Sequence, residues 1–436
     1  MGRASRKVTL AQLAMATYLM SSGGPYGIEE LIERSGYRMG VLLLVLVPVL
    51  WSFPVGLMVG ELGSAIPSEG GFYVWVRRAL GPFWGFQEAW LSLFSSVFDM
   101  AVYPTLFVLS LGKLWPPATA GHNGLFIGAA LVAACVLWNL MGARAVGEGS
   151  LVAGLVLLSP FAVIISLAVL NPGAATGFKA HPLEPPDFLA GLLVAMWNYM
   201  GWDNASTIAG EVENPRRTYP NVMAAAIGLA MVAYVVPVVA IWHAGFPRGV
   251  WATGSWVEIG SHMGGQWLGV VLLLTTMVST MGAFNSLTLS YSRIPVVMAE
   301  DGYLPTALTK RLANGAPWVS VTVCGIAWTA ALGLSFDRLL MLDILLYGAS
   351  LVLEFAALVA LRIREPELPR PFRVPGGIVG AVLVGVGPTV LLVCAGIQSR
   401  GDKLGELSAA AVGVAVMAAG VVFYFVSDAW RRRSSR

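Results

Sequence analysis

Turn signals divide the chain into about twelve long apolar runs, and this pattern limits what it can fold into. A helix needs about 20 apolar residues to cross the hydrocarbon core of a bilayer. Only 12% of the 436 residues are charged and 57% are hydrophobic, whereas soluble domains carry about 25% charged residues. The runs predict an all-α, polytopic membrane protein with spans at 8–34, 40–64, 84–112, 123–142, 147–170, 187–212, 218–244, 265–299, 316–334, 339–363, 376–398 and 406–427.

Two of these runs are interrupted at corresponding places. The first is broken by SGGPYG from Ser22 to Gly27, and the sixth by NYMGWD from Asn198 to Asp203. Lipid cannot satisfy the backbone N–H and C=O groups of a broken helix, so such a break must be buried in protein or line a cavity. Paired breaks in the two halves of a chain are typical of the binding site of a secondary transporter.

Basic residues predict the orientation of the spans. With the N-terminus in the cytoplasm, 19 of the 27 lysines and arginines fall on the cytoplasmic side and eight fall outside. Cytoplasmic loops are enriched in these residues, so we expect a multi-pass protein of the cell membrane with both termini cytoplasmic. The first and sixth spans are then antiparallel, which predicts a 5+5 inverted repeat within a single domain, residues 1–436. The repeats cover about 8–170 and 187–363, and two further helices lie within about 376–427.

The first break has the chemistry of an anion site. Glycine and proline favour unwinding at Gly23-Gly24-Pro25, and the second half-helix is expected to begin near Tyr26. The free N–H groups of a helix N-terminus attract anions, so a substrate carboxylate is expected there. The alternative is a glycine-lined kink that only lets helices pack closely. The predicted substrate-binding residues of this break are Ser22, Gly23, Gly24 and Tyr26.

The second break has a different character. The half-helix that ends at this break offers carbonyl oxygens, which suit an ammonium group, and the tryptophan and tyrosine side chains around it can hold a cation. For Asp203 two roles stay open, because aspartate is also a favoured N-cap. The predicted substrate-binding residues here are Trp197, Asn198, Tyr199, Gly201, Trp202 and Asp203.

Ionisable residues at membrane depth are functional candidates by default. Asp99 lies in the middle of the third span and is predicted to bind a substrate amine or to carry a proton. Glu354 lies in the tenth span, which Asp343 begins at an expected interfacial position. Glu61 ends the second span, where a gate or a structural ion pair is favoured. The candidates for gating or proton coupling are Glu61, Asp99, Asp203 and Glu354.

Several motifs resemble those of the amino acid–polyamine–organocation superfamily of permeases. They are WNYMGWD from Trp197, GEVENPRRTYP from Gly210, SGGPYGIE from Ser22, ELGSAIP from Glu61, GGFYVW from Gly70 and AEDGYLP from Ala299. The resemblance covers nearly the whole chain. Tyr199–Asp203, Asp99 before AVYP, and Leu353-Glu354-Phe355 are most similar to the polyamine-uptake branch known from plants.

The resemblance implies the inverted-repeat fold and assigns chemistry to the breaks. Members use the first break for the carboxylate of the substrate and the sixth helix for its amine, and a helix 6 aromatic residue closes over it, here Trp197 or Trp202. A proton-coupled branch has a lysine three residues before a proline in helix 5. This sequence has Leu157 before Pro160, which puts that coupling mechanism in doubt.

We therefore predict a secondary transporter of amino acids or polyamines that works by alternating access, with a lean towards polyamines or cationic substrates. It is expected to be proton-coupled or an exchanger, although Ser279 and Thr280 leave sodium open. The alternatives are a neutral amino acid permease or exchanger of the same fold and a non-transporting sensor. No metal-ligand spacing or catalytic motif is present, so we expect no metal, no cofactor, no nucleic-acid partner and no enzymatic activity. The expected partners are a small-molecule substrate and membrane lipid.

Overall fold

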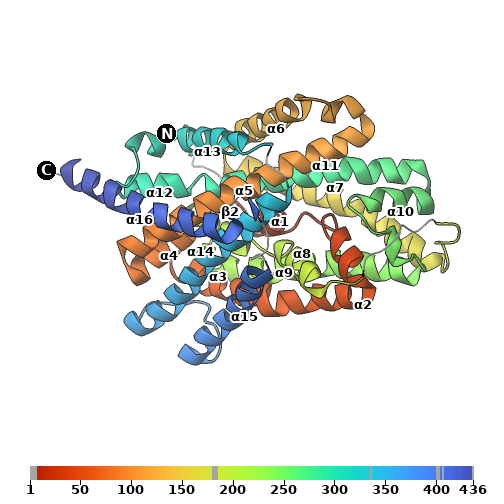
Figure 1. Ribbon diagram of the computed structural model, residues 1–436. Helices are drawn as coiled ribbons and strands as arrows, with labels where there is room; N and C mark the ends of the chain where they lie inside the picture. The colour runs from red at the N-terminus through yellow and green to blue at the C-terminus, as the bar shows by residue number, and fades with distance from the viewer. Residues whose placement is uncertain (1–6, 179–184, 334–335, 399–402, 405–406, 435–436) are drawn as a thin grey trace.

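The computed structural model describes residues 7–178, 185–333, 336–398, 403–404 and 407–434, and the chain is nearly all helical (Figure 1). The first half consists of α1 (Leu10–Ser21), α2 (Glu29–Val47), a π-helical turn at Pro48–Ser52, α3 (Phe53–Ala65), α4 (Gly71–Leu80), α5 (Pro82–Leu114), α6 (Asn123–Asn139) and α7 (Ala143–Leu170).

The second half begins with α8 (Phe188–Trp197) and two 3₁₀ turns, η3 (Trp202–Thr207) and η4 (Ala209–Glu211). It continues with α9 (Pro215–His243), α10 (Ser255–Gly264), α11 (Gln266–Tyr291), α12 (Ile294–Glu300), α13 (Trp318–Ala330) and α14 (Phe336–Arg364). The chain ends with α15 (Gly377–Gln398), the two-residue strands β1 (Lys403–Leu404) and β2 (Leu407–Ser408), and α16 (Ala409–Ser434).

The predicted spans are confirmed as helices of a membrane protein. Within the described residues, eight helical segments are long and apolar enough to cross a bilayer, and α6 and α13 are shorter apolar helices. The two broken helices complete the set. Leu334 of the ninth predicted span and Glu406 of the twelfth lie outside the described residues, as do Arg3, Arg6, Lys179, Arg400 and Arg436 of the charge count.

Both predicted breaks are present, with small shifts in their bounds. Helix α1 ends at Ser21 and the chain becomes helical again only at Glu29, three residues after the expected Tyr26. Positive φ angles at Gly24 (74°) and Gly27 (92°) keep this stretch out of the helical region. After α8 ends at Trp197, Gly201 has a φ of 90°, and the second half of the broken helix 6 continues as 3₁₀ turns.

The two broken helices lie side by side and antiparallel. Val8, just before α1, forms a bridge with Val212, just after η4. At the breaks themselves, the Asn198 side-chain amide donates to the Gly27 carbonyl at 3.1 Å. This arrangement is the one that the inverted repeat requires.

Two short helices, α4 and α10, were not expected from the sequence. Helix α4 follows the second span and α10 follows the seventh, so they occupy equivalent places in the two halves. They lie at opposite ends of the helix bundle (Figure 1), as inversion of the second half demands. We call the end that carries α4, α12 and the C-terminal part of α16 the terminal end, and the other the α10 end.

Buried ion pairs close the terminal end. Glu61 is fully buried and binds both Arg362 and Arg370, and it also accepts a hydrogen bond from the Val374 N–H at 2.7 Å. Arg293, also fully buried, lies 2.8 Å from Glu211. Among the described residues, every ion pair except Glu30–Arg34 belongs to this end, where α5, α14 and their neighbours converge.

A partly exposed pair at the same end provides a comparison. Arg78 binds Glu365 through two nitrogens, at 2.9 and 2.5 Å, with 43% and 31% of the two side chains exposed. The guanidinium holds the pKa of Glu365 below its usual value. Exposed pairs of this kind contribute about 0–1 kcal/mol, whereas removing one partner of a buried pair costs about 3–5 kcal/mol.

Glu61→Gln is therefore expected to destabilise the protein strongly. The substitution keeps the size of the side chain but leaves two arginines at the terminal end without a counter-charge, at a cost of about 3–5 kcal/mol. Thermal denaturation of the purified protein in detergent measures the effect. Glu365→Gln is the matched control and should change the free energy of unfolding by less than about 1 kcal/mol; equal shifts for the two variants would contradict the buried network.

Candidate substrate-binding site

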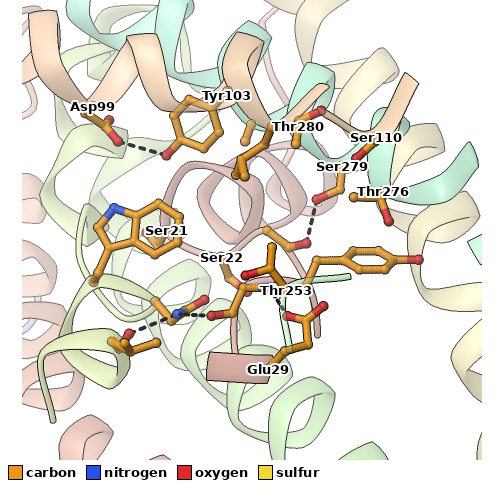
Figure 2. A pocket seen from close by; sticks show the side chains of 18 of the residues that line it. Ser21, Ser22, Glu29, Asp99, Tyr103, Ser110, Thr253, Thr276, Ser279 and Thr280 are labelled. Atoms are coloured by element: carbon orange, nitrogen blue, oxygen red, sulfur yellow. Dashed lines mark hydrogen bonds between the residues drawn. The ribbon is translucent and has the colours of Figure 1, made fainter. Parts of the chain in front are cut away.

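A cavity of about 480 Å³ lies between the two breaks and extends towards the α10 end. Its wall is made by the first break, α5, the end of α8, α10, α11 and α14. Figure 2 shows Asp99 and Tyr103 at the top of the view and Glu29 at the bottom, well away from Asp99, with Thr276, Ser279 and Thr280 of α11 on the right. Of the residues predicted to bind substrate, those on the wall are Ser22, Gly23, Tyr26, Asp99, Trp197, Asn198 and Gly201.

Three carbonyl groups of the first break accept hydrogen bonds from side chains of α11, of α10 and of the C-cap of α8. Ser279 Oγ on α11 donates to the Gly23 carbonyl, and Trp256 Nε1 on α10 donates to the Pro25 carbonyl at 2.7 Å. The Gly27 carbonyl accepts from Asn198, as described above. These contacts fix the shape of the break without help from lipid.

Two N–H groups of the same break also have partners. The Gly24 N–H donates to Ser22 Oγ at 3.3 Å, and the Gly27 N–H donates to Glu29 Oε2 at 2.6 Å. Pro25 has no N–H to offer. Glu29 lies on the cavity wall and only 3% of it is exposed, so one of the chain's own carboxylates takes the position expected for a substrate carboxylate.

The second break is joined to the cavity through a tyrosine on α14. The Gly201 N–H donates to the Tyr347 hydroxyl at 3.0 Å, and that hydroxyl donates to Asp203 Oδ1. Tyr347 lies on the wall, while Asp203 is buried behind it with 2% exposure. The Asn198 carbonyl accepts from the Tyr234 hydroxyl at 3.0 Å. Asp203 therefore does not line the cavity itself, and the Tyr347 hydroxyl links it to the cavity wall.

Besides Glu29, two acids line the wall and have no basic partner among the described residues. Asp99 on α5 accepts hydrogen bonds from the Tyr103 hydroxyl at 3.0 Å and from the Tyr291 hydroxyl at 3.4 Å. Asp343 accepts from Ser95 and lies close enough to Asp99 for their charges to interact. We expected Asp343 at the membrane interface, but α14 begins at Phe336, which places Asp343 two turns inside the helix.

Further acids lie behind this wall, towards the terminal end. Glu88 and Glu354 are both fully buried, and the charge of each interacts with that of Asp203. Glu88 accepts a hydrogen bond from Ser92 at 2.8 Å, but neither oxygen of Glu354 has a hydrogen-bond partner among the described residues. Within the described part of the chain, no ion pair involves Glu88, Asp99, Asp203, Asp343 or Glu354.

Besides Asp203, three predicted residues near the breaks do not lie on the wall. A Cβ at Gly24 would lie 2.8 Å from Leu157 Cδ1, so this glycine faces α7. Tyr199 is fully buried, and its hydroxyl donates to the Leu44 carbonyl at 2.9 Å. Trp202 is fully buried as well and donates to the Tyr199 carbonyl at 2.8 Å. Of the two tryptophans considered for closing the cavity, the half-buried Trp197 is the one on its wall.

Several residues of the wall could not be recognised from the sequence. Tyr103 and Tyr291, which bind Asp99, carry no sequence signal beyond the spacing of Tyr103 four residues after Asp99. Glu29 has a weak one, an acid in the first turn of a half-helix. Among the described residues that line the cavity, Lys113 is the basic one; it is exposed at the end of α5 near Gly254.

The position of Leu157 bears on coupling. Its side chain packs against Gly24, so the residue that replaces the expected lysine does touch the first break. A leucine cannot carry a proton. Any proton coupling in this chain must use other groups, and the buried acids are the titratable groups closest to the cavity.

The chain is similar to known transporters over most of its length. The amino acid permease family model matches residues 14–424. The polyamine transporter RMV1 of Arabidopsis thaliana is 33% identical over 390 residues, which are 89% of this chain and 79% of the relative. The polyamine transporter PUT1 of Oryza sativa subsp. japonica is 33% identical over 425 residues, 97% of this chain and 78% of the relative.

A more distant relative and a solved structure extend the comparison. The serine/threonine exchanger SteT of Bacillus subtilis is 26% identical over 337 residues, 73% of this chain and 74% of the relative. The crystal structure of MhsT in complex with L-phenylalanine superposes with a TM-score of 0.62 at 13% identity, and covers 91% of this chain and 99% of that chain. This likeness shows a shared fold. With a family match over almost the whole length and two broken helices around a cavity, the chain belongs to the amino acid permease family of multi-pass membrane transporters.

Proposed function

We propose that this protein carries polyamines or similar small organic cations across the cell membrane. The observation that carries the proposal is the pair of buried acids on the cavity wall, Asp99 and Asp343, which have no basic partner among the described residues. A buried carboxylate is costly unless it is paired. A substrate with several ammonium groups and no carboxylate supplies the missing charge, and two relatives at 33% identity are named polyamine transporters.

Aromatic side chains complete this cation site. Trp197 and Tyr103 both lie on the wall, and the face of an aromatic ring attracts a cation. Trp197 comes directly before the second break, at the end of α8. A small rotation of α8 would carry its indole ring over a bound substrate, and we assign Trp197 the closing role.

The cavity and the ion pairs together describe one state of alternating access. The cavity extends to the α10 end, while Glu61 and Arg362 close the terminal end. The excess of basic residues at the terminal end supports a cytoplasmic location for it. The conformation is then the outward-facing one, and inward opening requires the buried ion pairs of the terminal end to separate.

Protons are the proposed coupling ion. Asp203 is linked to the cavity through Tyr347, and Glu88 and Glu354 lie behind it without basic partners among the described residues. Such acids can gain and lose protons as the cavity opens to either side. Sodium is the alternative, because Ser279 and Thr280 place hydroxyl groups on the wall.

Asp99→Asn is expected to weaken the binding of a diamine about tenfold or more, because a charged hydrogen bond contributes about 1.5–3 kcal/mol. Titration of the purified protein with putrescine and with alanine measures the effect, and alanine binding should change less. Glu258→Gln is the control: it removes an exposed charge at the α10 end, outside the cavity. Equal losses for both ligands would contradict a charge-reading role of Asp99 and favour the neutral amino acid alternative.

Asp203→Asn and Glu354→Gln are expected to uncouple transport from the pH gradient. Uptake of labelled putrescine into proteoliposomes should lose its acceleration by an imposed gradient, while exchange of labelled for unlabelled putrescine continues. Glu148→Gln, at an exposed surface pair with Arg144, serves as the control with normal coupling. Dependence of uptake on sodium rather than on the pH gradient would overturn the proton assignment, and binding without any exchange would indicate a sensor.

A further inference from the structure

The first break of this chain has an unusual occupant. A half-helix N-terminus inside a membrane transporter is a place where the carboxylate of an amino acid substrate binds. Here the Gly27 N–H donates instead to Glu29 Oε2, at 2.6 Å. Two neighbouring positions offer no free donor either, because the Gly24 N–H donates to Ser22 Oγ and residue 25 is a proline.

The Glu29 side chain is held in this position. It is 3% exposed, lies on the cavity wall, and also interacts with the backbone of Gly254 next to α10. The adjacent acid behaves differently: Glu30 accepts from Thr253 Oγ1 at 2.8 Å and lies 3.9 Å from Arg34. Among the described ion pairs none involves Glu29, so its partners are backbone groups.

Two effects disfavour the binding of a second carboxylate at the N-terminus of this half-helix. It would find the Gly27 N–H already occupied, and it would lie close to the carboxylate of Glu29. Two like charges at such short range repel far more strongly inside a protein than in water, because the effective dielectric constant there is lower. Specificity against a competitor often comes from such a repulsive element.

We propose that Glu29 determines specificity: its carboxylate occupies the place where an α-amino acid would bind its own, so that the cavity accepts amines and rejects amino acids. This inference rests on the proposed function, since it concerns the same cavity. The amine end of a substrate is bound by Asp99, which lies well away from Glu29 (Figure 2), and by Asp343, whose charge interacts with that of Asp99. Glu29 therefore acts on the carboxylate alone.

A matched pair of ligands isolates this effect. Ornithine is putrescine with one added carboxylate. The dissociation constant of ornithine divided by that of putrescine therefore measures how strongly the cavity disfavours that group. The wild-type protein should bind putrescine at least about tenfold more tightly than ornithine. In Glu29→Ala this ratio should fall about tenfold or more, because the N–H of Gly27 becomes free and the repelling charge is gone.

Two further variants separate charge from structure. Glu29→Gln keeps a side-chain oxygen that can accept from Gly27 but removes the charge, so the ratio should fall by less than in Glu29→Ala. It also guards against a failure of Glu29→Ala to fold. Glu258→Gln removes an exposed charge at the α10 end, outside the cavity, and should leave the ratio unchanged.

Titration calorimetry or thermal shifts of the purified full-length variants provide the readout, and each outcome is decisive. A ratio that stays constant in both Glu29 variants overturns the inference while leaving the amine-binding cavity intact. Equal affinity of the wild-type protein for ornithine and putrescine also overturns it. Absence of putrescine binding in the wild-type protein, with binding of amino acids instead, overturns the proposed function and this inference with it.

Discussion

The structure depends on satisfying backbone groups that lipid cannot satisfy. Between Ser22 and Ile28 the chain leaves the helical conformation in the interior of the bundle, and each unpaired buried backbone group costs several kcal/mol. Side chains from α8, α10 and α11 meet this requirement by binding the carbonyls of Gly27, Pro25 and Gly23. The cavity lies where these elements converge, so the elements that stabilise the break also form the binding site.

The charges of the molecule are segregated in a way that supports this arrangement. At the terminal end, buried arginines form ion pairs: Arg293 binds Glu211, and Arg362 and Arg370 bind Glu61. The acids around the cavity have no such partners among the described residues. A ligand that binds only the folded state adds to its stability, so a cation or a proton that completes this site also stabilises the protein.

The sequence was sufficient for the features that local chemistry determines. Apolar runs predicted the spans, and glycine and proline predicted both breaks to within three residues. The short helices α4 and α10 were not predicted because ten-residue helices are too short to show the apolar pattern of a transmembrane span. Which side chains near a break face the cavity was not predictable either: Trp197 lies on the wall, whereas Tyr199 and Trp202 pack behind it.

That difference has a physical cause in tertiary packing. Tyr199 is turned away by its hydrogen bond to the Leu44 carbonyl of α2, a partner 155 residues distant in the chain. The role of Glu29 was hidden for a similar reason, because an acid in the first turn of a helix is ordinarily just a favourable partner for the helix dipole. Only the cavity in front of it distinguishes this acid from many others.

Helices α5 and α14 connect the cavity to the closed terminal end. They pack against each other, and each carries a pair of buried acids about three helical turns apart: Glu88 and Asp99 on α5, and Asp343 and Glu354 on α14. Further along α14, beyond Glu354, lies Arg362, the partner of Glu61 in the ion pair that closes this end. Charge that is gained or lost at the cavity therefore acts on the same rigid helix that holds the closure. A proton or a cation that binds at the cavity can therefore shift the equilibrium between the closed and open states of the terminal end without touching its ion pairs. This requires that the proton or cation binds one of the two states more tightly than the other.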